Sequence, residues 1–438
     1  MKASKLLWPI GIGVLVAATL AVMSAIFMHW RLDRPSSAER RLARVLAERP
    51  RVPDTDNAYI YLWGFQAAMD VDPARAGAER LAWLAEFNLG GRSAPDPLAD
   101  GLDFEQLQSA QLDDVLAACK VDKQIGCRTA FEALGPVPAW SRCDLLLLAR
   151  YERLLRHSGY YATVRSELHS PVPPWVAILA AQRRYFIRMR DFARTADVAT
   201  IRAQLEADLS FWRMAQESAD DLIAKMIAVA AIRQHFFLGC LVLRALPPAH
   251  VGDALPDAWR RPMSAPERSM WRVYAGELEF TRSVVREMEH PIGEPSVLSE
   301  AGSPAAEVLE KISSGIFPPR MMVRTMARQY ADVAQAFEVP LENYLTAQET
   351  LGKKPRLVAS SMAYPVRVAA VETWRRAAML AAQLRADAVP APAIPARVAG
   401  TGLRDPLTGK AFEWDPLERA VVATQARTKS NPRLYFFH

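Results

Sequence analysis

The sequence has few of the residues, and none of the short motifs, on which the commonest catalytic chemistries depend. Its 438 residues include 4 Cys and 7 His. No H-E-x-x-H, C-x-x-C or G-x-S-x-G is present, which excludes the metalloprotease, thioredoxin-like and serine-hydrolase motifs. Around Gly409-Lys410 the first Gly and the Ser or Thr of a phosphate loop are missing. The sequence therefore predicts no metal and no cofactor, and it leans against an enzyme.

A strong charge of either sign is also absent. The 54 basic and 48 acidic residues leave a net charge of +6, and no dense basic block accompanies it. This pattern argues against a nucleic-acid partner. Only 20 Gly are present, while Ala, Leu, Arg and Glu are abundant, and this composition favours helices. A chain of this length can bury a sizeable core.

One long apolar run opens the chain. Residues 6–28 carry no charge, and about 20 apolar residues are enough to cross a bilayer as a helix. A cleavable signal peptide would have a shorter apolar core and small residues at a cleavage site. The run therefore predicts an uncleaved anchor over residues 1–30, spanning a bacterial inner membrane once.

The orientation of this anchor has arguments on both sides. Lys2 and Lys5 precede the span, and five Arg between residues 31 and 44 follow it, so the positive-inside count places the large domain in the cytoplasm. Long domains, however, cross the membrane largely regardless of charge, and a short Met-Lys start is typical of bacterial signal-anchors. We favour the periplasm for the bulk of the chain.

Two cysteines eight residues apart bear on this location. In an oxidising compartment Cys119 and Cys127 would close a small loop; the alternative is that all four cysteines are buried thiols. Residues eight apart on one helix are separated by about 12 Å, beyond the reach of a disulfide. The bond therefore requires a helix to end near Cys119 and the chain to turn back through residues 122–126.

The chain beyond the anchor divides into three parts. We predict a polar juxtamembrane linker over 31–56, a helical domain over 57–389, and a Pro-rich linker with a small β-rich tail over 390–438. The fold class is mainly α: an N-terminal transmembrane helix, an irregular helical bundle and a small C-terminal β element.

Helical periodicity dominates the middle of the chain. Apolar residues recur every 3.6 residues from Trp175 to Met189, from Ile201 to Ala215, from Trp271 to Met288 and from Met322 to Phe337. The capping-box spacing from Ser264 to Glu267 predicts the start of the third of these helices. Charged residues interrupt the apolar run 222–246, which predicts a central buried helix and not a second span.

Two short segments resemble parts of known bacterial proteins. Asn57-Ala58-Tyr59 opens an apolar, aromatic stretch for which an N-cap at Asp56 or Asn57 predicts a helix. With the preceding span, it resembles uncharacterised proteobacterial single-pass membrane-anchored proteins that carry an Asn-Ala-Tyr segment after the anchor. The run from Asp405 to Phe412 resembles a small C-terminal β element of exported bacterial proteins. Neither resemblance implies an activity.

The candidate site residues are few. Arg320, Arg324 and Arg328 lie four apart on one helical face, where they would receive a phosphate head group, an acidic protein or an anionic glycan; the alternative is a solvated face or pairing with carboxylates. His157 and His290 are expected to cap helix C-termini. Two pairs of acids are not expected to act together. Glu277 and Glu279 are two residues apart and diverge on a helix, whereas Glu338 and Glu342 are four apart but Pro340 interrupts the helix between them.

These observations favour a binding or scaffold component of the cell envelope, with an envelope protein or an anionic glycan or lipid as partner. The alternative is an envelope hydrolase, glycan-directed or otherwise, with an acid buried in the helical domain. A deep polar pocket holding two facing carboxylates would favour the hydrolase. A convex surface with an exposed apolar patch would favour binding.

Overall fold

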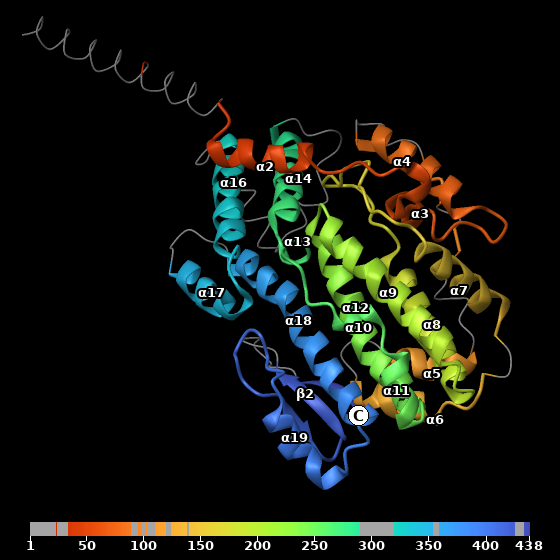
Figure 1. Ribbon diagram of the computed structural model, residues 1–438. Helices are drawn as coiled ribbons and strands as arrows, with labels where there is room; N and C mark the ends of the chain where they lie inside the picture. The colour runs from red at the N-terminus through yellow and green to blue at the C-terminus, as the bar shows by residue number, and fades with distance from the viewer. Residues whose placement is uncertain are drawn as a thin grey trace, which may run out of the picture.

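The computed structural model describes Met23 and residues 34–88, 95–98, 101–102, 110–119, 124–137, 140–289, 319–353, 359–424 and 433–438. The predicted anchor lies outside the described residues except for Met23, as does His290. Within the described ranges the protein is mainly helical, with a small sheet near the C-terminus (Figure 1). The predicted mainly-α class is confirmed for this part of the chain.

A central helix, α10 (Leu222–Ala245), organises the bundle. It contacts α8 (Trp175–Arg194), α9 (Val198–Ser218), α14 (Trp271–Glu289) and α18 (Ala359–Ala386). Among the described helices it is the one long and apolar enough to cross a membrane, and 78% of its most apolar window is buried in the protein. It is therefore the central core helix that the sequence predicts.

The remaining helices surround this centre. They are α2 (Ser37–Ala47), α3 (Ala58–Trp63), α4 (Pro73–Asn88), α5 (Ala110–Ala118), α6 (Gln124–Ala133), α7 (Arg142–Leu154), α11 (Pro248–Ala254), α12 (Asp257–Arg260), α13 (Ala265–Arg268), α16 (Pro319–Ala336), α17 (Tyr344–Gly352) and α19 (Ile394–Gly400). Asn57 caps α3 as predicted, because its side chain accepts a hydrogen bond from the Tyr59 amide at 3.1 Å.

The described part of the predicted juxtamembrane linker, residues 34–56, begins with a short helix that packs on the bundle. It contains α2, which packs against α14 and α16. Leu42 and Leu46 are buried on its inner side, and Arg41 lies over the Trp271 ring at 3.8 Å. A capping box between Ser36 and Glu39 starts the helix. The polar appearance of this segment reflects the outer face of a docked helix.

The capping box of Ser264 and Glu267 forms, but it opens a different helix from the predicted one. It starts α13, a single turn, and the chain is extended at Ser269 before α14 begins at Trp271. The Glu267 carboxylate also accepts a hydrogen bond from Arg213 Nη2 at 2.8 Å. The turn is thus held in place by a buried ion pair, and this long-range contact is not visible in the local sequence.

The C-terminal part joins the same core. Three antiparallel strands in the order β1 (Glu413–Asp415), β2 (Ala420–Thr424) and β3 (Arg433–Phe437) form the predicted β element, with Val421 opposite Phe436. This sheet packs on α18 and α10. The predicted Pro-rich linker is wrong: residues 391–400 form a 3-10 turn and α19, because Pro is well tolerated in a first helical turn.

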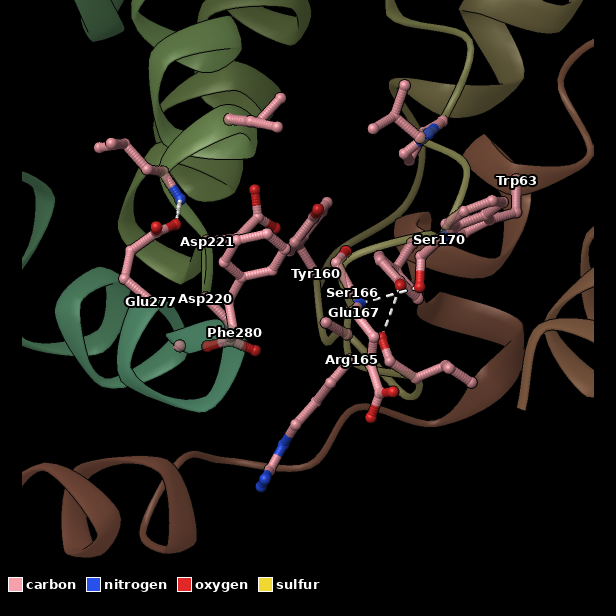
Figure 2. Close-up of a pocket in the computed structure, with 18 of the residues that line it drawn as sticks. Trp63, Tyr160, Arg165, Ser166, Glu167, Ser170, Asp220, Asp221, Glu277 and Phe280 are labelled. Atoms are coloured by element: carbon pink, nitrogen blue, oxygen red, sulfur yellow. Dashed lines mark hydrogen bonds between the residues drawn. The ribbon is translucent and has the colours of Figure 1, made fainter. Parts of the chain in front are cut away.

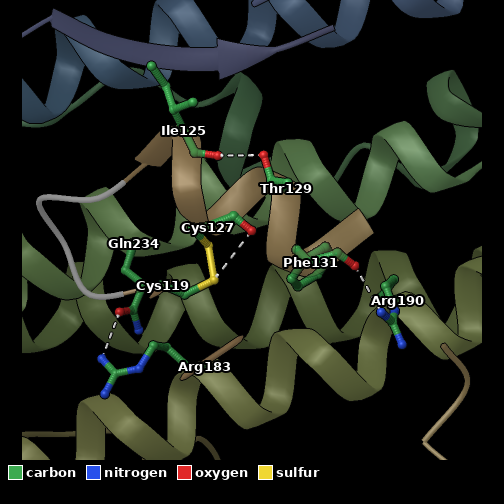
Figure 3. Close-up of a disulfide and its surroundings, with 8 residues drawn as sticks. All are labelled: Cys119, Ile125, Cys127, Thr129, Phe131, Arg183, Arg190 and Gln234. Atoms are coloured by element: carbon green, nitrogen blue, oxygen red, sulfur yellow. Dashed lines mark hydrogen bonds between the residues drawn. A yellow bond between two sulfur atoms is a disulfide. The ribbon is translucent and has the colours of Figure 1, made fainter. Parts of the chain in front are cut away.

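Cys119 and Cys127 are joined by a disulfide, with their Cα atoms 4.3 Å apart (Figure 3). Helix α5 ends at Ala118, and Cys127 lies in α6, so the two cysteines are not on one continuous helix, as the reach of a disulfide requires. The predicted turn falls partly on residues 120–123, which lie outside the described residues. Cys143 and Cys240 are free thiols.

Candidate functional site: an acidic and aromatic cavity

A cavity of about 320 Å³ lies at one end of the bundle, where the corner between α9 and α10 meets α14 (Figure 2). The end of α2, helix α3 and the segment 160–175 complete its wall. Most of the lining is apolar or aromatic. Figure 2 shows Asp221 and Glu277 on one side, Trp63 on the opposite side and Tyr160 between them. We call this the acid–aromatic cavity.

The start of α10 positions the two acids. Asp221 is the N-cap of α10, and its Oδ1 accepts a hydrogen bond from the Ala224 amide at 2.7 Å. Glu277, on α14, accepts the Leu222 amide at 2.9 Å. Gly276 permits this close approach, because a Cβ there would lie 1.7 Å from the backbone oxygen of Asp220. Two carboxyls from different helices thus cap one helix N-terminus.

The neighbouring Asp220 is balanced by basic side chains, whereas the other two acids are not. Arg272 Nη2 lies 2.8 Å from Asp220 Oδ1, and Arg49 pairs with the other oxygen. Among the described residues, no Lys or Arg forms an ion pair with Asp221 or Glu277. The cavity therefore presents two carboxyls whose negative charge the surrounding side chains leave unbalanced.

Burial and mutual repulsion change the acidity of these two groups. Burial, with the charge of Asp220 adding to it, raises the pKa of Asp221 to about 6. Burial also raises the pKa of Glu277 to about 6, and the charge of Asp221 adds to that shift. Both side chains remain half-exposed, because they open onto the cavity. Carboxyls with raised pKa in a concave site are a recurring mark of functional sites.

Three buried polar groups around the cavity have no hydrogen-bond partner among the described residues. They are the Tyr160 hydroxyl and the indole Nε1 atoms of Trp63 and Trp175. The three side chains are 3%, 0% and 8% exposed. Burial raises the pKa of Tyr160 well above its usual value, so its hydroxyl stays protonated. An unpaired buried polar group costs about 1–3 kcal/mol.

Exposed aliphatic side chains lie at the cavity beside polar lining residues such as Arg165 and Ser166. Val172 and Ile223 line the cavity and are each 53% exposed. Val176, one residue beyond the lining Trp175, is 64% exposed. These aliphatic side chains surround an opening that is also aromatic inside. The site therefore suits a ligand with a substantial apolar part.

The predicted arginine stripe lies elsewhere. Arg320, Arg324 and Arg328 share one face of α16; Arg320 and Arg328 are exposed and Arg324 is half-buried. None of the three lines the acid–aromatic cavity. His157 caps α7 as predicted, with its Nδ1 atom 3.1 Å from the Leu154 oxygen.

The predicted divergence of the acid pairs holds. Glu279 pairs with Arg282 and Arg165, away from the carboxyl of Glu277. Glu338 accepts a hydrogen bond from Trp271 Nε1 at 2.6 Å.

A second acid lies next to a histidine in the core, but it forms no site. His235 Nδ1 contacts Asp208 Oδ2 at 2.7 Å, and Trp259 Nε1 donates to His235 Nε2 at 2.6 Å. Both ring nitrogens are thus occupied, and His235 and Asp208 are fully buried. His235 therefore has no free nitrogen with which to act as a base on a substrate.

Within the described residues no group of three or more His, Cys, Asp or Glu side chains is placed to hold a metal ion. Comparisons with protein-family models, with curated proteins and with solved structures found no match for this chain. The cavity itself is therefore the feature that indicates a function.

The sequence analysis did not identify the residues of this cavity. It considered Glu277 only beside Glu279, although its structural neighbour is Asp221, 56 positions earlier. One local signal was present: Asp220-Asp221 lies between two strongly periodic helices, and an acid there predicts an N-cap. Nothing in the local sequence indicates that Glu277 reaches the same helix end.

Proposed function

We propose that the protein is a single-pass component of a bacterial cell envelope that works by binding a small ligand in the acid–aromatic cavity. The observation that carries the proposal is an aromatic cavity onto which two carboxyls open, neither of which forms an ion pair with a Lys or Arg among the described residues. Envelope attachment is supported by the uncharged run of residues 6–28, and a periplasmic position by the disulfide between Cys119 and Cys127.

The shape and lining of the site favour binding. Small-molecule sites are concave, mostly apolar and furnished with a few polar groups that orient the ligand. The acid–aromatic cavity has this composition, and the exposed Val172, Val176 and Ile223 continue it to the surface. The arginine stripe of α16 remains our proposal for a separate contact with an anionic lipid, glycan or envelope protein.

Filling the cavity tests this function. The probe is 3-phenylpropan-1-ol, a neutral ligand, titrated by calorimetry into the full-length protein in lipid nanodiscs, with empty nanodiscs as the blank. Ala162 lines the cavity and is 6% exposed, so Ala162→Trp should weaken binding at least tenfold and Ala162→Leu by less. The matched control is Ala396→Trp, at an exposed position on α19. Equal affinity in all four proteins would reject the cavity as the site at which this probe binds.

A second candidate function is hydrolysis, and the raised pKa values of Asp221 and Glu277 favour it. An acid that titrates near pH 6 can donate and accept protons at neutral pH. The walls are mainly apolar, however, whereas the sequence-based criterion for a glycan hydrolase was a polar pocket. Turnover of nitrophenyl esters or glycosides that disappears in Asp221→Asn and Glu277→Gln would establish catalysis. Turnover equal to that of the variants would leave binding as the function.

A further inference from the structure

The charges around the cavity do not balance, and the imbalance has a definite sign. Asp220, Asp221 and Glu277 meet at the start of α10, and two arginines, Arg49 and Arg272, both pair with Asp220. The other charged lining residues are paired elsewhere, Arg165 with Glu279 and Glu167 with Arg286. Three acids and two arginines thus leave one negative charge when all are ionised. The amide groups of the helix N-terminus supply a partial positive charge of only about half a unit. When Asp221 and Glu277 are both ionised, the cavity wall therefore keeps a net negative charge.

The aromatic lining is complementary to the same kind of ligand. Tyr160, Trp175 and Phe280 line the cavity near these acids, and the faces of aromatic rings attract cations. The protein uses this interaction next to the cavity, where the Arg49 guanidinium lies 4.1 Å from the centre of the Tyr161 ring.

We propose that the acid–aromatic cavity recognises an organic cation, a ligand with a positively charged amino group attached to an apolar body. The ammonium group lies against Asp221 and Glu277 at the start of α10. The apolar body extends toward Trp63 and the aliphatic rim. This proposal rests on the binding function proposed above and names the class of its ligand.

An anionic ligand does not fit the same arrangement. At the start of α10 it would face Asp221 and Glu277, and buried like charges repel strongly. The basic lining residues are already paired, Arg49 with Asp220 and Arg165 with Glu279. A neutral ligand fills the apolar space but leaves the two carboxyls without a counter-charge. The order of affinity is therefore cation, then neutral molecule, then anion.

A matched series of probes tests this order. The probes are 3-phenylpropylammonium, 3-phenylpropan-1-ol and 3-phenylpropanoate, which share one apolar body and differ in charge. Calorimetry on the full-length protein in nanodiscs near pH 8 should show the ammonium binding at least tenfold tighter than the alcohol, and the carboxylate weakest. Lowering the pH to about 4.5 protonates the two acids and should remove most of the preference for the cation.

Two variants remove charge and keep the helix caps. Asp221→Asn still accepts the Ala224 amide, and Glu277→Gln still accepts the Leu222 amide, so both are expected to fold. Each should reduce the ammonium-to-alcohol preference to within about threefold, with the alcohol affinity unchanged. The matched controls are Asp197→Asn, at the N-cap of α9, and Glu206→Gln, whose carboxylate caps the Ala258 amide outside the cavity. Both controls should keep the full preference.

The outcomes separate the two proposals. If the alcohol binds and the ammonium binds no more tightly, the cationic ligand class is wrong and the binding cavity stands. If none of the three probes binds, the binding function itself is wrong. A preference that survives in both Asp221→Asn and Glu277→Gln would place the cation elsewhere and overturn the inference.

Discussion

Replacing Asp221 by Asn should make the folded protein more stable at neutral pH. The pKa of Asp221 is raised from 3.8 to about 6 by burial and by the charge of Asp220, a shift of about two units. At about 1.36 kcal/mol per unit, ionisation in the folded state costs about 3 kcal/mol. Because the carboxyl opens onto the cavity, solvent and relaxation reduce this cost, and we expect a gain of about 1–2 kcal/mol. The amide keeps the N-cap.

The sign of the pH dependence follows from the direction of the shift. An acid whose pKa is raised by folding favours the folded state when protonated, and this contribution is lost as the pH rises from about 4 through about 6. The advantage of Asp221→Asn should therefore be full near pH 8 and mostly absent near pH 4.5.

Urea unfolding of the full-length protein in detergent micelles, followed by circular dichroism at both pH values, measures this advantage. The N-cap control Asp197→Asn should show no gain at either pH. A loss of stability in Asp221→Asn that is equal at both pH values would mean that the carboxylate is a structural cap. The reasoning from an unbalanced functional charge would then be refuted.

Four further predictions concern architecture and location. Trp271 is 8% exposed and its Nε1 bonds Glu338, so Trp271→Ala should destabilise the protein by about 3–5 kcal/mol in urea unfolding; a change near zero would contradict its core position. Alkaline phosphatase fused after residue 100 should be active, and activity of a cytoplasmic reporter at the same site would reverse the topology. Non-reducing peptide mapping of protein purified from the envelope should find Cys119 linked to Cys127, whereas a Cys127 that alkylates without reductant would argue against export. Closing this short loop is worth somewhat under the ~3 kcal/mol assigned to a 15-residue loop, so Cys127→Ser should lower the free energy of unfolding by a similar amount.

Several features of this fold were readable from the sequence because they depend on neighbours a few residues apart. The stripe from Ile201 to Ala215 predicts a buried helix face. Its five positions are all buried in the structure: Ile201, Leu205, Leu209, Trp212 and Ala215. Charged residues within 222–246 distinguish a core helix from a membrane span. Asn57 is a residue type that favours the N-cap position, so the sequence predicts that a helix begins just after it. A disulfide between Cys119 and Cys127 is possible only if the helix before Cys119 ends there, because eight residues of continuous helix would hold the two cysteines too far apart.

Other features depend on contacts between distant parts of the chain, and only the tertiary structure decides them. Segment 31–56 reads as a linker because its buried face, Leu42 and Leu46, has meaning only against α14 and α16. The prolines of residues 391–400 suggest an extended linker. The same residues are also tolerated in the first turn of a helix, so the sequence does not distinguish the two structures. The pairing of Asp221 with Glu277 arises where α14 passes the start of α10, at a close approach that Gly276 permits. The amino-acid sequence determines which segments are helical and apolar. The packing of these segments decides which acids share a cavity and which of them have no basic side chain as an ion-pair partner.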